Sequence, residues 1–377
     1  MQETVPTTLY ERIKNEIIAD IAAGKLKAGE RAPSERALAE RSGVSRITAK
    51  RALADLIAEG VLARLPRRKG AFVRSSTGGK VPRLIAVAID DVRGSFGSNM
   101  LRGIEDYFWD RRIHTLICNA DRDFDKVEEY FRSLLASGVS GVIFAPVIDV
   151  GYVQRNRALI AILERAGIPY TLIDRYIPGL LANYAVANHE ESSRYLTERL
   201  FEKGYERILL VRGLECTSMD DREAGYRHAH ADASRTVDER LIVRVNENIL
   251  NRGPGGEEDR RLARLSREAG RFDCVFALND GLLRGAVRVL RDMGLPIGGV
   301  IGAATHGELD SPPLPELASA PHFVEPSYEM GWEAAKILVD YIMDPGKAIV
   351  QKVLKSRFVP GAAGYDAAGH GAAGHGA

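Results

Sequence analysis

The segment Pro33–Val73 decides the fold at the start of the chain, and it reads PSERALAERSGVSRITAKRALADLIAEGVLARLPRRKGAFV. Ser34 has the position of an N-cap before a predicted helix, which Gly43 ends. Ser45 has the same position before a second predicted helix. The apolar residues of that helix recur at intervals of three and four and are Ala49, Ala52, Leu53, Leu56 and Ile57. The pattern predicts two helices joined by a tight turn, the second of which buries one face.

The opposite side of the second helix begins with hydroxyl and cationic side chains. They belong to Ser45, Arg46, Thr48 and Lys50. A helix whose first turns present such groups fits the major groove of DNA, where hydroxyls and cations contact phosphates and base edges.

A predicted basic hairpin follows the second helix. Two short runs, 61–65 and 71–73, flank a tip that contains Arg67, Arg68 and Lys69. Three consecutive cations at a hairpin tip are suited to phosphates or to the minor groove. The alternative is a three-helix packing module with an ordinary basic surface, but the coincidence of caps, turn glycine, helix cations and hairpin favours DNA binding.

This segment resembles the winged helix-turn-helix domain of the gluconate-repressor (GntR) family of bacterial transcription factors. The resemblance covers residues 8–73 and is carried by GKLxxGE from Gly24, PSERxLA from Pro33, GVSRxT from Gly43 and KGAFV from Lys69. It implies DNA contacts at Arg36, Ser45, Arg46, Thr48, Lys50 and Gly70.

Length and charge indicate more than one domain in this 377-residue chain. Residues 1–76 contain 15 Lys and Arg against nine Asp and Glu, a net charge of +6, whereas the remaining residues carry −5. A basic head on a mildly acidic body is typical of a nucleic-acid-binding module joined to a ligand-binding module. We predict a winged helix-turn-helix domain over 1–74, a linker over 75–82, a two-lobed effector-binding and dimerisation domain over 83–360 and a disordered Gly/Ala/His tail over 361–377.

The compartment is predicted from the apolar segments and the cysteines. No apolar run reaches the length of a membrane span, and the N-terminal segment has no signal-peptide core. Cys118, Cys216 and Cys274 lie in or near apolar runs and are expected to be buried free thiols. We therefore expect a cytoplasmic protein.

From Arg83 onward, short β-branched runs alternate with helical stretches. The predicted strands are 84–89, 115–118, 141–144, 170–173, 208–211, 242–245, 274–278, 300–301 and 349–358. Continuous apolar strands separated by amphipathic helices are typical of parallel sheets covered on both faces. So many strands predict an α/β fold with two such sheets, in which a ligand binds beyond the carboxyl ends of the strands, in the cleft between two lobes.

Polar residues collect where several of these predicted strands end. They are Asp90, Asp91, Asp174, Arg175, Asn188, His189, Asn279 and Asp280, and the aromatic Phe96 follows the first two. Charged groups beside an aromatic ring suit a polyhydroxylated ligand, which offers hydroxyls to the charges and apolar C–H faces to the ring. The alternative is that these residues cap helices, and it is stronger for Asn279 and Asp280 than for Asp174 and Arg175, which precede no clear helix.

This part of the chain resembles the effector domain of LacI/GalR-type regulators, which is related to periplasmic sugar-binding proteins. The resemblance spans residues 83–360 and includes SGVSGVI from Ser137, GIPYTLIDR from Gly167 and FALND from Phe276. It implies ligand contacts at Asp91, Phe96, Asp174, Arg222, Asn279 and Glu325. The combination of head and body is similar to the arabinose-repressor subgroup of the GntR family.

One departure from this resemblance concerns the strand predicted at 300–301. The family usually has one or two aspartates after it, whereas this chain continues with AATH from Ala303. A carboxylate expected to bind sugar hydroxyls is therefore missing at Ala304, which leaves the ligand open. His306 is either its substitute or a histidine of a surface loop.

The two resemblances imply a sequence-specific transcription regulator, expected to be a repressor, whose effector is a sugar or sugar derivative. A single winged head reads a short half-site, so we expect a homodimer on double-stranded operator DNA. The sequence lacks the common nucleotide-binding, hydrolase and metalloprotease motifs, and we predict no enzyme activity, cofactor or metal. Two alternatives remain: a sugar-binding protein without regulatory coupling, and a sugar-acting enzyme that uses Asp91 and Asp174 as acid and base.

Overall fold

The structure, a computed structural model, describes most of the chain. The described residues are 9–22, 25–26, 30–58, 61–64, 70–73, 82–92, 94–246, 250, 254–295, 297–298, 301–307, 309, 317 and 320–361. The chain divides into two compact units. One contains the N-terminal residues to Leu84, and the other contains most of the remaining chain. We call residues 9–73 the head and residues 82–361 the body. The predicted linker and tail lie almost entirely outside the described residues, so these domain boundaries stay predictions.

Three helices and a short hairpin form the head. They are α1 (Leu9–Ala22), α2 (Glu35–Ser42), α3 (Arg46–Ala58), β1 (Leu62–Ala63) and β2 (Phe72–Val73). The buried core residues contributed by the helices include Ile13, Ile17, Leu38, Ala49, Ala52, Leu53 and Leu56. The amide of Ala37 donates to Ser34 Oγ at 3.2 Å, which caps α2. Gly43 ends α2 at a φ of 63°, a left-handed conformation that glycine adopts without strain. The predicted helix, turn and helix are confirmed.

Residues 30–32 run beside β2 and pair with it on the outer side of the hairpin. The amide of Ala32 donates to the carbonyl of Ala71 at 2.9 Å. Gly70 has a φ of 112°, and a Cβ at this position would lie 2.6 Å from Arg31 Nε. Position 70 therefore requires glycine for its backbone conformation, whereas the flexible Arg31 side chain could move away from a Cβ.

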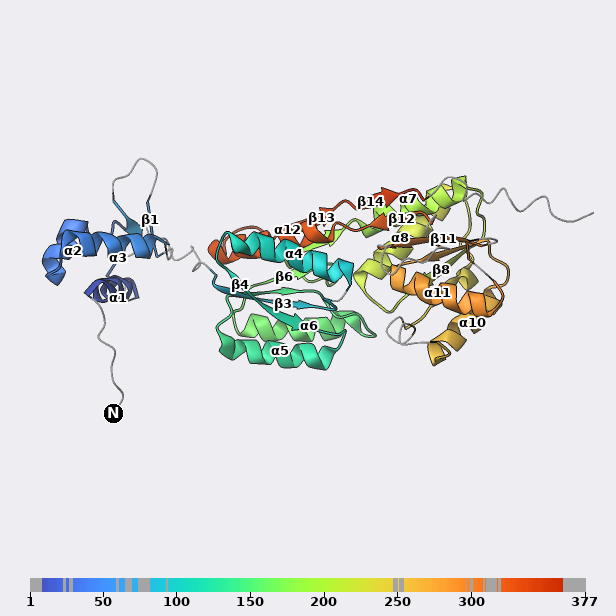
Figure 1. The fold of residues 1–377 in the computed structure, drawn as a ribbon, viewed down its shortest axis with the longest axis horizontal. Helices are drawn as coiled ribbons and strands as arrows, with labels where there is room; N and C mark the ends of the chain where they lie inside the picture. Colours follow the sequence, from blue (N-terminus) through green and yellow to red (C-terminus); the bar gives the residue numbers. More distant parts are fainter. Residues whose placement is uncertain are drawn as a thin grey trace, which may run out of the picture. The chain divides into compact units, whose positions relative to one another are not determined.

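The first lobe of the body is a six-stranded sheet in the order β13-β7-β6-β5-β3-β4. Its strands are β3 (Leu84–Ile89), β4 (His114–Asn119), β5 (Gly141–Phe144), β6 (Tyr170–Ile173), β7 (Tyr184–Ala187) and β13 (Gln351–Leu354). Its helices are α4 (Ser95–Trp109), α5 (Phe124–Ser137), α6 (Tyr152–Arg165) and α12 (Ser327–Met343). Neighbouring strands from β13 to β3 pair in parallel. The helices α4 and α12 cover one face of the sheet, and α5 and α6 cover the other (Figure 1).

The second lobe repeats this arrangement with the strand order β14-β12-β11-β10-β8-β9. Its strands are β8 (Ile208–Arg212), β9 (Ile242–Arg244), β10 (Cys274–Ala277), β11 (Gly302–His306), β12 (His322–Val324) and β14 (Arg357–Val359). Its helices are α7 (His189–Glu202), α8 (Thr217–Asp232), α10 (Glu257–Ala269) and α11 (Asp280–Asp292). Only β14 runs antiparallel to its neighbour among the pairs described. Two parallel sheets with helices on both faces confirm the predicted α/β fold, and the three cysteines are buried free thiols.

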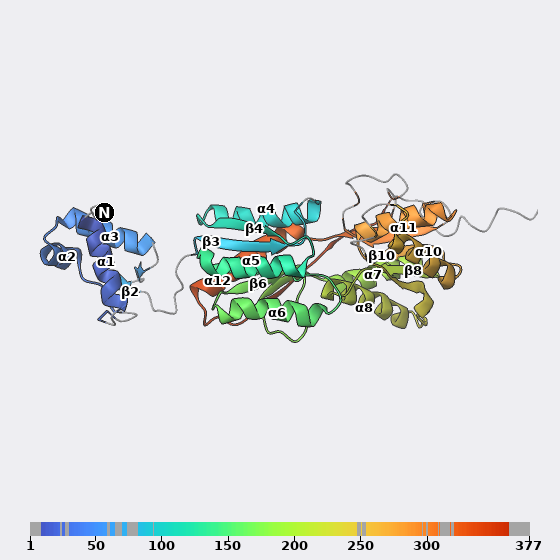
Figure 2. The ribbon, with the colours of Figure 1, turned by 90° about the horizontal axis from the view of Figure 1, so that it is seen from below.

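Three connections join the lobes: β7 to α7, β12 to α12, and β13 to β14 (Figure 2). The last one corrects a prediction, because the single strand expected over 349–358 breaks after Leu354 into two strands that belong to different sheets. The amide of Ser356, inside the break, donates to Asn188 Oδ1 at 2.8 Å. Asn188 lies in the first connection, so its side chain holds two of the three connections together.

Candidate functional site

The start of α3 carries four of the predicted DNA-contacting residues. Ser45 Oγ accepts a hydrogen bond from the Thr48 amide at 3.1 Å and lies 2.8 Å from Thr48 Oγ1. The Ser45 hydroxyl therefore caps α3. Arg46 and Lys50 are exposed and present their charges to solvent on the first two turns.

Ile47 lies on the same surface and is missing from the predicted set. Its side chain is 81% exposed on the first turn of α3. It falls outside the buried stripe that begins at Ala49, and this phase difference is the signal by which the sequence could have revealed it. An exposed apolar side chain at this place suits contact with the C5-methyl group of thymine.

The structure describes only some of the other predicted DNA contacts. Arg36 Nε lies 3.6 Å from Glu40 on the exposed side of α2. Surface pairs of this kind contribute little free energy, so Arg36 can exchange Glu40 for a phosphate. Arg67, Arg68 and Lys69 lie outside the described residues, and their role stays a prediction.

A cavity of about 300 Å³ lies in the body where the carboxyl ends of strands from both lobes meet. All eight predicted effector contacts line it: Asp91, Phe96, Asp174, Arg175, Arg222, Asn279, Asp280 and Glu325. Lining residues absent from that set include Asp90, Arg122, Ser218, Met219 and His306. The two lobes thus bring together residues from Ile89 to Glu325, which lie 236 positions apart in the chain.

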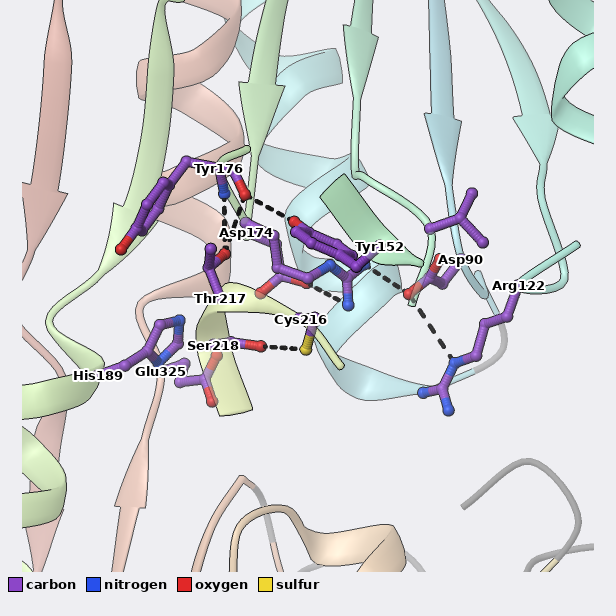
Figure 3. Close-up of polar contacts among 12 residues, drawn as sticks. Asp90, Arg122, Tyr152, Asp174, Tyr176, His189, Cys216, Thr217, Ser218 and Glu325 are labelled. Atoms are coloured by element: carbon purple, nitrogen blue, oxygen red, sulfur yellow. Dashed lines mark hydrogen bonds and ion pairs between the residues drawn. The ribbon is translucent and has the colours of Figure 1, made fainter. Parts of the chain in front are cut away.

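Arg175 holds two carboxylates on the first lobe's side of the cavity. Its Nη2 lies 2.5 Å from Asp90 Oδ2, and its Nη1 lies 3.2 Å from Asp174 Oδ2. Arg122 Nε approaches the same Asp90 oxygen at 3.8 Å (Figure 3). Burial raises the pKa of Asp174, and the Arg175 guanidinium opposes that rise. Asp174 also has a φ of 67°, a backbone strain that is typical of functional sites.

Arg222, on α8, organises the opposite side. It donates to the carbonyl of Leu278 at 2.6 Å and to the carboxylate of Glu325, and its Nη2 lies 3.1 Å from His189 Nδ1. A guanidinium only donates, so Nδ1 accepts and a neutral His189 ring carries its proton on Nε2. Burial, together with the charge of Arg222, lowers the pKa of His189 well below its ordinary value. Burial raises the pKa of Glu325, and Arg222 opposes that rise.

Asp174, His189 and Glu325 each bring one possible metal-ligand atom within 4.8 Å of the others (Figure 3). Carboxylate and imidazole are donors that zinc and related ions accept. However, His189 and Glu325 already accept hydrogen bonds from Arg222, and Asp174 pairs with Arg175. A cation here would face two guanidinium charges, so the geometry favours an ion-pair network over a metal centre.

The strand that ends at His306 differs from the predicted one. The described strand is β11, Gly302–His306. Of the predicted strand 300–301, Val300 lies outside the described residues and Ile301 forms an isolated bridge with Ile297. The sequence did not reveal β11 because its small residues have little strand propensity. Ala303 and Ala304 lie inside β11 and are absent from the cavity lining, so the expected aspartate position is not at the cavity. The residue that reaches the cavity is His306, which is 0% exposed. The alternative that His306 belongs to a surface loop is therefore wrong.

Asn279 and Asp280 follow β10 at the start of α11. The amide of Leu282 donates to Asn279 Oδ1 at 2.7 Å, so Asn279 caps α11. The capping alternative is thus confirmed for Asn279, which lines the cavity as well. Asn279 both caps α11 and lines the cavity, because α11 begins at the carboxyl edge of the sheet.

Buried polar atoms that lack a hydrogen-bond partner within the described structure gather around the cavity. On residues that line it they are Asp90 Oδ1, Arg175 Nε, Arg222 Nε and both ring nitrogens of His306, and His189 Nε2 belongs to a residue that contacts Arg222. Folded proteins leave few buried polar atoms unsatisfied. Such a concentration in one place indicates groups that meet a polar ligand.

The lobes also contact each other directly beside the cavity. Tyr176 follows β6, and its amide donates to Thr217 Oγ1 at 3.1 Å (Figure 3). Its hydroxyl donates to Asp221 Oδ1 at 3.1 Å. Burial raises the pKa of Asp221 to about 6, and the hydrogen bond from Tyr176 opposes that rise. The first turns of α8 thus carry both the cavity arginine and the bridge to the first lobe.

Two family models match the chain. The model for bacterial regulatory proteins of the gntR family matches residues 9–73, and that for the periplasmic binding protein-like domain matches residues 197–363. Among curated relatives, the probable HTH-type transcriptional regulator EndR of Paenibacillus polymyxa is 25% identical over 268 residues, covering 69% of this chain and 73% of that protein. The HTH-type transcriptional regulator DegA of Bacillus subtilis is 28% identical over 263 residues, covering 68% and 73%.

Solved structures show the same fold. A complex of the transcriptional regulator CelR with cellobiose matches with a TM-score of 0.62 at 21% identity, covering 87% of this chain and 98% of that chain. A LacI family regulator from Enterococcus faecium with bound ribose matches with a TM-score of 0.57 at 23% identity, covering 74% and 97%. Together with the head and the two-lobed body described above, these matches show that the chain joins a GntR-type helix-turn-helix domain to a periplasmic-binding-protein-like domain.

Proposed function

We propose that this protein is a sequence-specific transcription regulator whose DNA binding is controlled by a small molecule held in the cavity between the lobes. The observation that carries the proposal is the cavity's set of unsatisfied buried polar atoms, in a chain whose head exposes Arg46 and Lys50 on the predicted recognition helix. A ligand that completes those hydrogen bonds binds both lobes at once. The difference between its affinities for the closed and the open arrangement then sets how far it can shift the protein's conformation.

The chemistry of the cavity favours an uncharged, hydroxyl-rich ligand. Its lining carboxylates are Asp90, Asp91, Asp174, Asp280 and Glu325, against the guanidinium groups of Arg122, Arg175 and Arg222. Each of these three arginines already meets a carboxylate, so none is reserved for a phosphate. Phe96 offers a ring to the apolar face of a sugar. Related structures hold cellobiose and ribose, which is consistent with a sugar as effector.

The proposed regulator acts as a homodimer on double-stranded operator DNA in the cytoplasm. A single winged head contacts a short half-site, and useful affinity needs two heads on a near-palindrome. We assign the dimer interface to the body and infer repression because relatives named PurR are transcriptional repressors. Light scattering that shows a strict monomer, both alone and with operator DNA, would remove this mechanism.

The decisive experiment is a titration of the purified protein against DNA from upstream of its own gene. We expect salt-sensitive binding that changes when one member of a panel of pentoses, hexoses and disaccharides is added. A sugar that binds without any change in DNA affinity would instead identify a binding protein without regulatory coupling. Conversion of a bound sugar to product, lost in Asp174→Asn, would identify an enzyme.

A further inference from the structure

His306 is held in an unusual place for a histidine. Its ring lies between Phe276 and Phe323, with centroids 5.8 Å from each and interplanar angles of 25° and 18°. The two phenyl rings stack against the imidazole, which borders the cavity, and both of its nitrogens are buried. Neither nitrogen has a hydrogen-bond partner in the part of the chain that the structure describes.

Packing alone does not explain a histidine at this position. An aromatic hydrocarbon ring would fill the same space between Phe276 and Phe323 without burying two unpartnered nitrogens, which is unfavourable. Burial, with Arg222 and His189 adding to it, lowers the pKa of His306 well below its ordinary value. The ring is therefore neutral and offers one N–H donor and one acceptor.

We propose that His306 is a ligand-contacting residue that determines the specificity of the cavity, through hydrogen bonds between the edge of its ring and a hydroxyl group of an uncharged sugar. This inference rests on the proposed function. The carboxylate that the LacI/GalR resemblance predicts near this strand would only accept hydrogen bonds, whereas the imidazole both donates and accepts. The chain therefore selects a different hydroxyl arrangement from one read by an aspartate.

The test compares the full-length protein with His306→Phe, which keeps a ring between the two phenylalanines and removes both nitrogens. Calorimetric titrations use D-ribose, L-arabinose, D-xylose, D-galactose and cellobiose. We expect the sugar that the wild type binds most tightly to lose about tenfold or more in affinity, and His306→Gln, which again donates and accepts, to recover part of it. Unchanged affinity in His306→Phe would overturn the proposal.

Thermal unfolding without ligand gives a second readout. The unpartnered nitrogens destabilise the fold, so the Tm of His306→Phe is expected to equal or exceed that of the wild type. A lower Tm would show that the nitrogens serve the fold and would overturn the proposal. If the wild type binds none of the five sugars, the sugar assignment in the proposed function fails on its own, and the Tm comparison still decides whether His306 is a structural residue.

Discussion

The guanidinium of Arg222 donates a hydrogen bond to the carboxylate of Glu325, and the pair joins α8 to the connection between β12 and α12. Both side chains are buried. Loss of one partner would leave an uncompensated buried charge, which costs about 3–5 kcal/mol. The pair thus links α8, in the wall of the cavity, to one of the three segments that connect the lobes.

Replacement of Arg222 by lysine is expected to weaken or abolish the effector response while DNA binding without effector persists. Lysine keeps a positive charge for Glu325 but has no planar fork with which to reach Leu278 and His189 as well. Operator titrations with and without the active sugar measure the response. The matched control is Arg227→Lys on the same helix, because Arg227 pairs with Glu223 and lies outside the cavity. A full response in the Arg222 variant would contradict the prediction.

Local signals made the head predictable from its sequence. Ser34, Gly43 and Ser45 mark helix ends through chemistry that acts within a few residues, and the stripe from Ala49 follows the helical period. Most strands of the body were equally visible, since each is a continuous apolar run between helices.

The features that escaped prediction depend on contacts between distant parts of the chain. The run Gly302–His306 is too small and polar to signal a buried strand. The break between β13 and β14 contains no glycine or proline, and Asn188, far away in sequence, holds it. Arg222 and Glu325 are 103 residues apart, and only the family resemblance suggested that both belong to one site.

Asp221 is expected to make the stability of the body depend on pH. Folding raises its pKa from 3.8 to about 6, so the folded state binds the proton more tightly than the unfolded state. Its contribution to the free energy of unfolding therefore falls as the pH rises from about 4 to about 6, and the full penalty remains above that range. Asp221→Asn, which still accepts a hydrogen bond from Tyr176, is expected to have a higher Tm than the wild type at neutral pH and to lose this advantage in acid.

Thermal unfolding at a series of pH values checks this expectation. The exposed Asp292, on α11, provides the control substitution Asp292→Asn. If the Tm difference between Asp221→Asn and the wild type were the same at acid and neutral pH, the burial of Asp221 beside Tyr176 would not be the cause.

Arg46 is expected to read a base rather than only a phosphate. Arg46→Ala should cost about 1–3 kcal/mol on the cognate operator and reduce discrimination against altered half-sites. Arg46→Lys keeps the charge but loses the bidentate fork, so it should bind nonspecific DNA almost as well as the wild type while discriminating less. Equal losses on cognate and unrelated DNA in both variants would instead assign Arg46 to the phosphate backbone.

Arg67, in the predicted hairpin tip, is expected to contact phosphate. Arg67→Ala should weaken binding to all DNA sequences alike, and it should reduce the slope of log affinity against log salt by about one, because one fewer counterion is released. Titrations on cognate and unrelated DNA over a range of salt concentrations measure both effects. Arg267→Ala, which removes an exposed arginine of the body, is the charge-matched control and should leave the slope unchanged. An unaltered slope in Arg67→Ala would mean that the tip does not touch the DNA backbone and that the head binds through α3 alone.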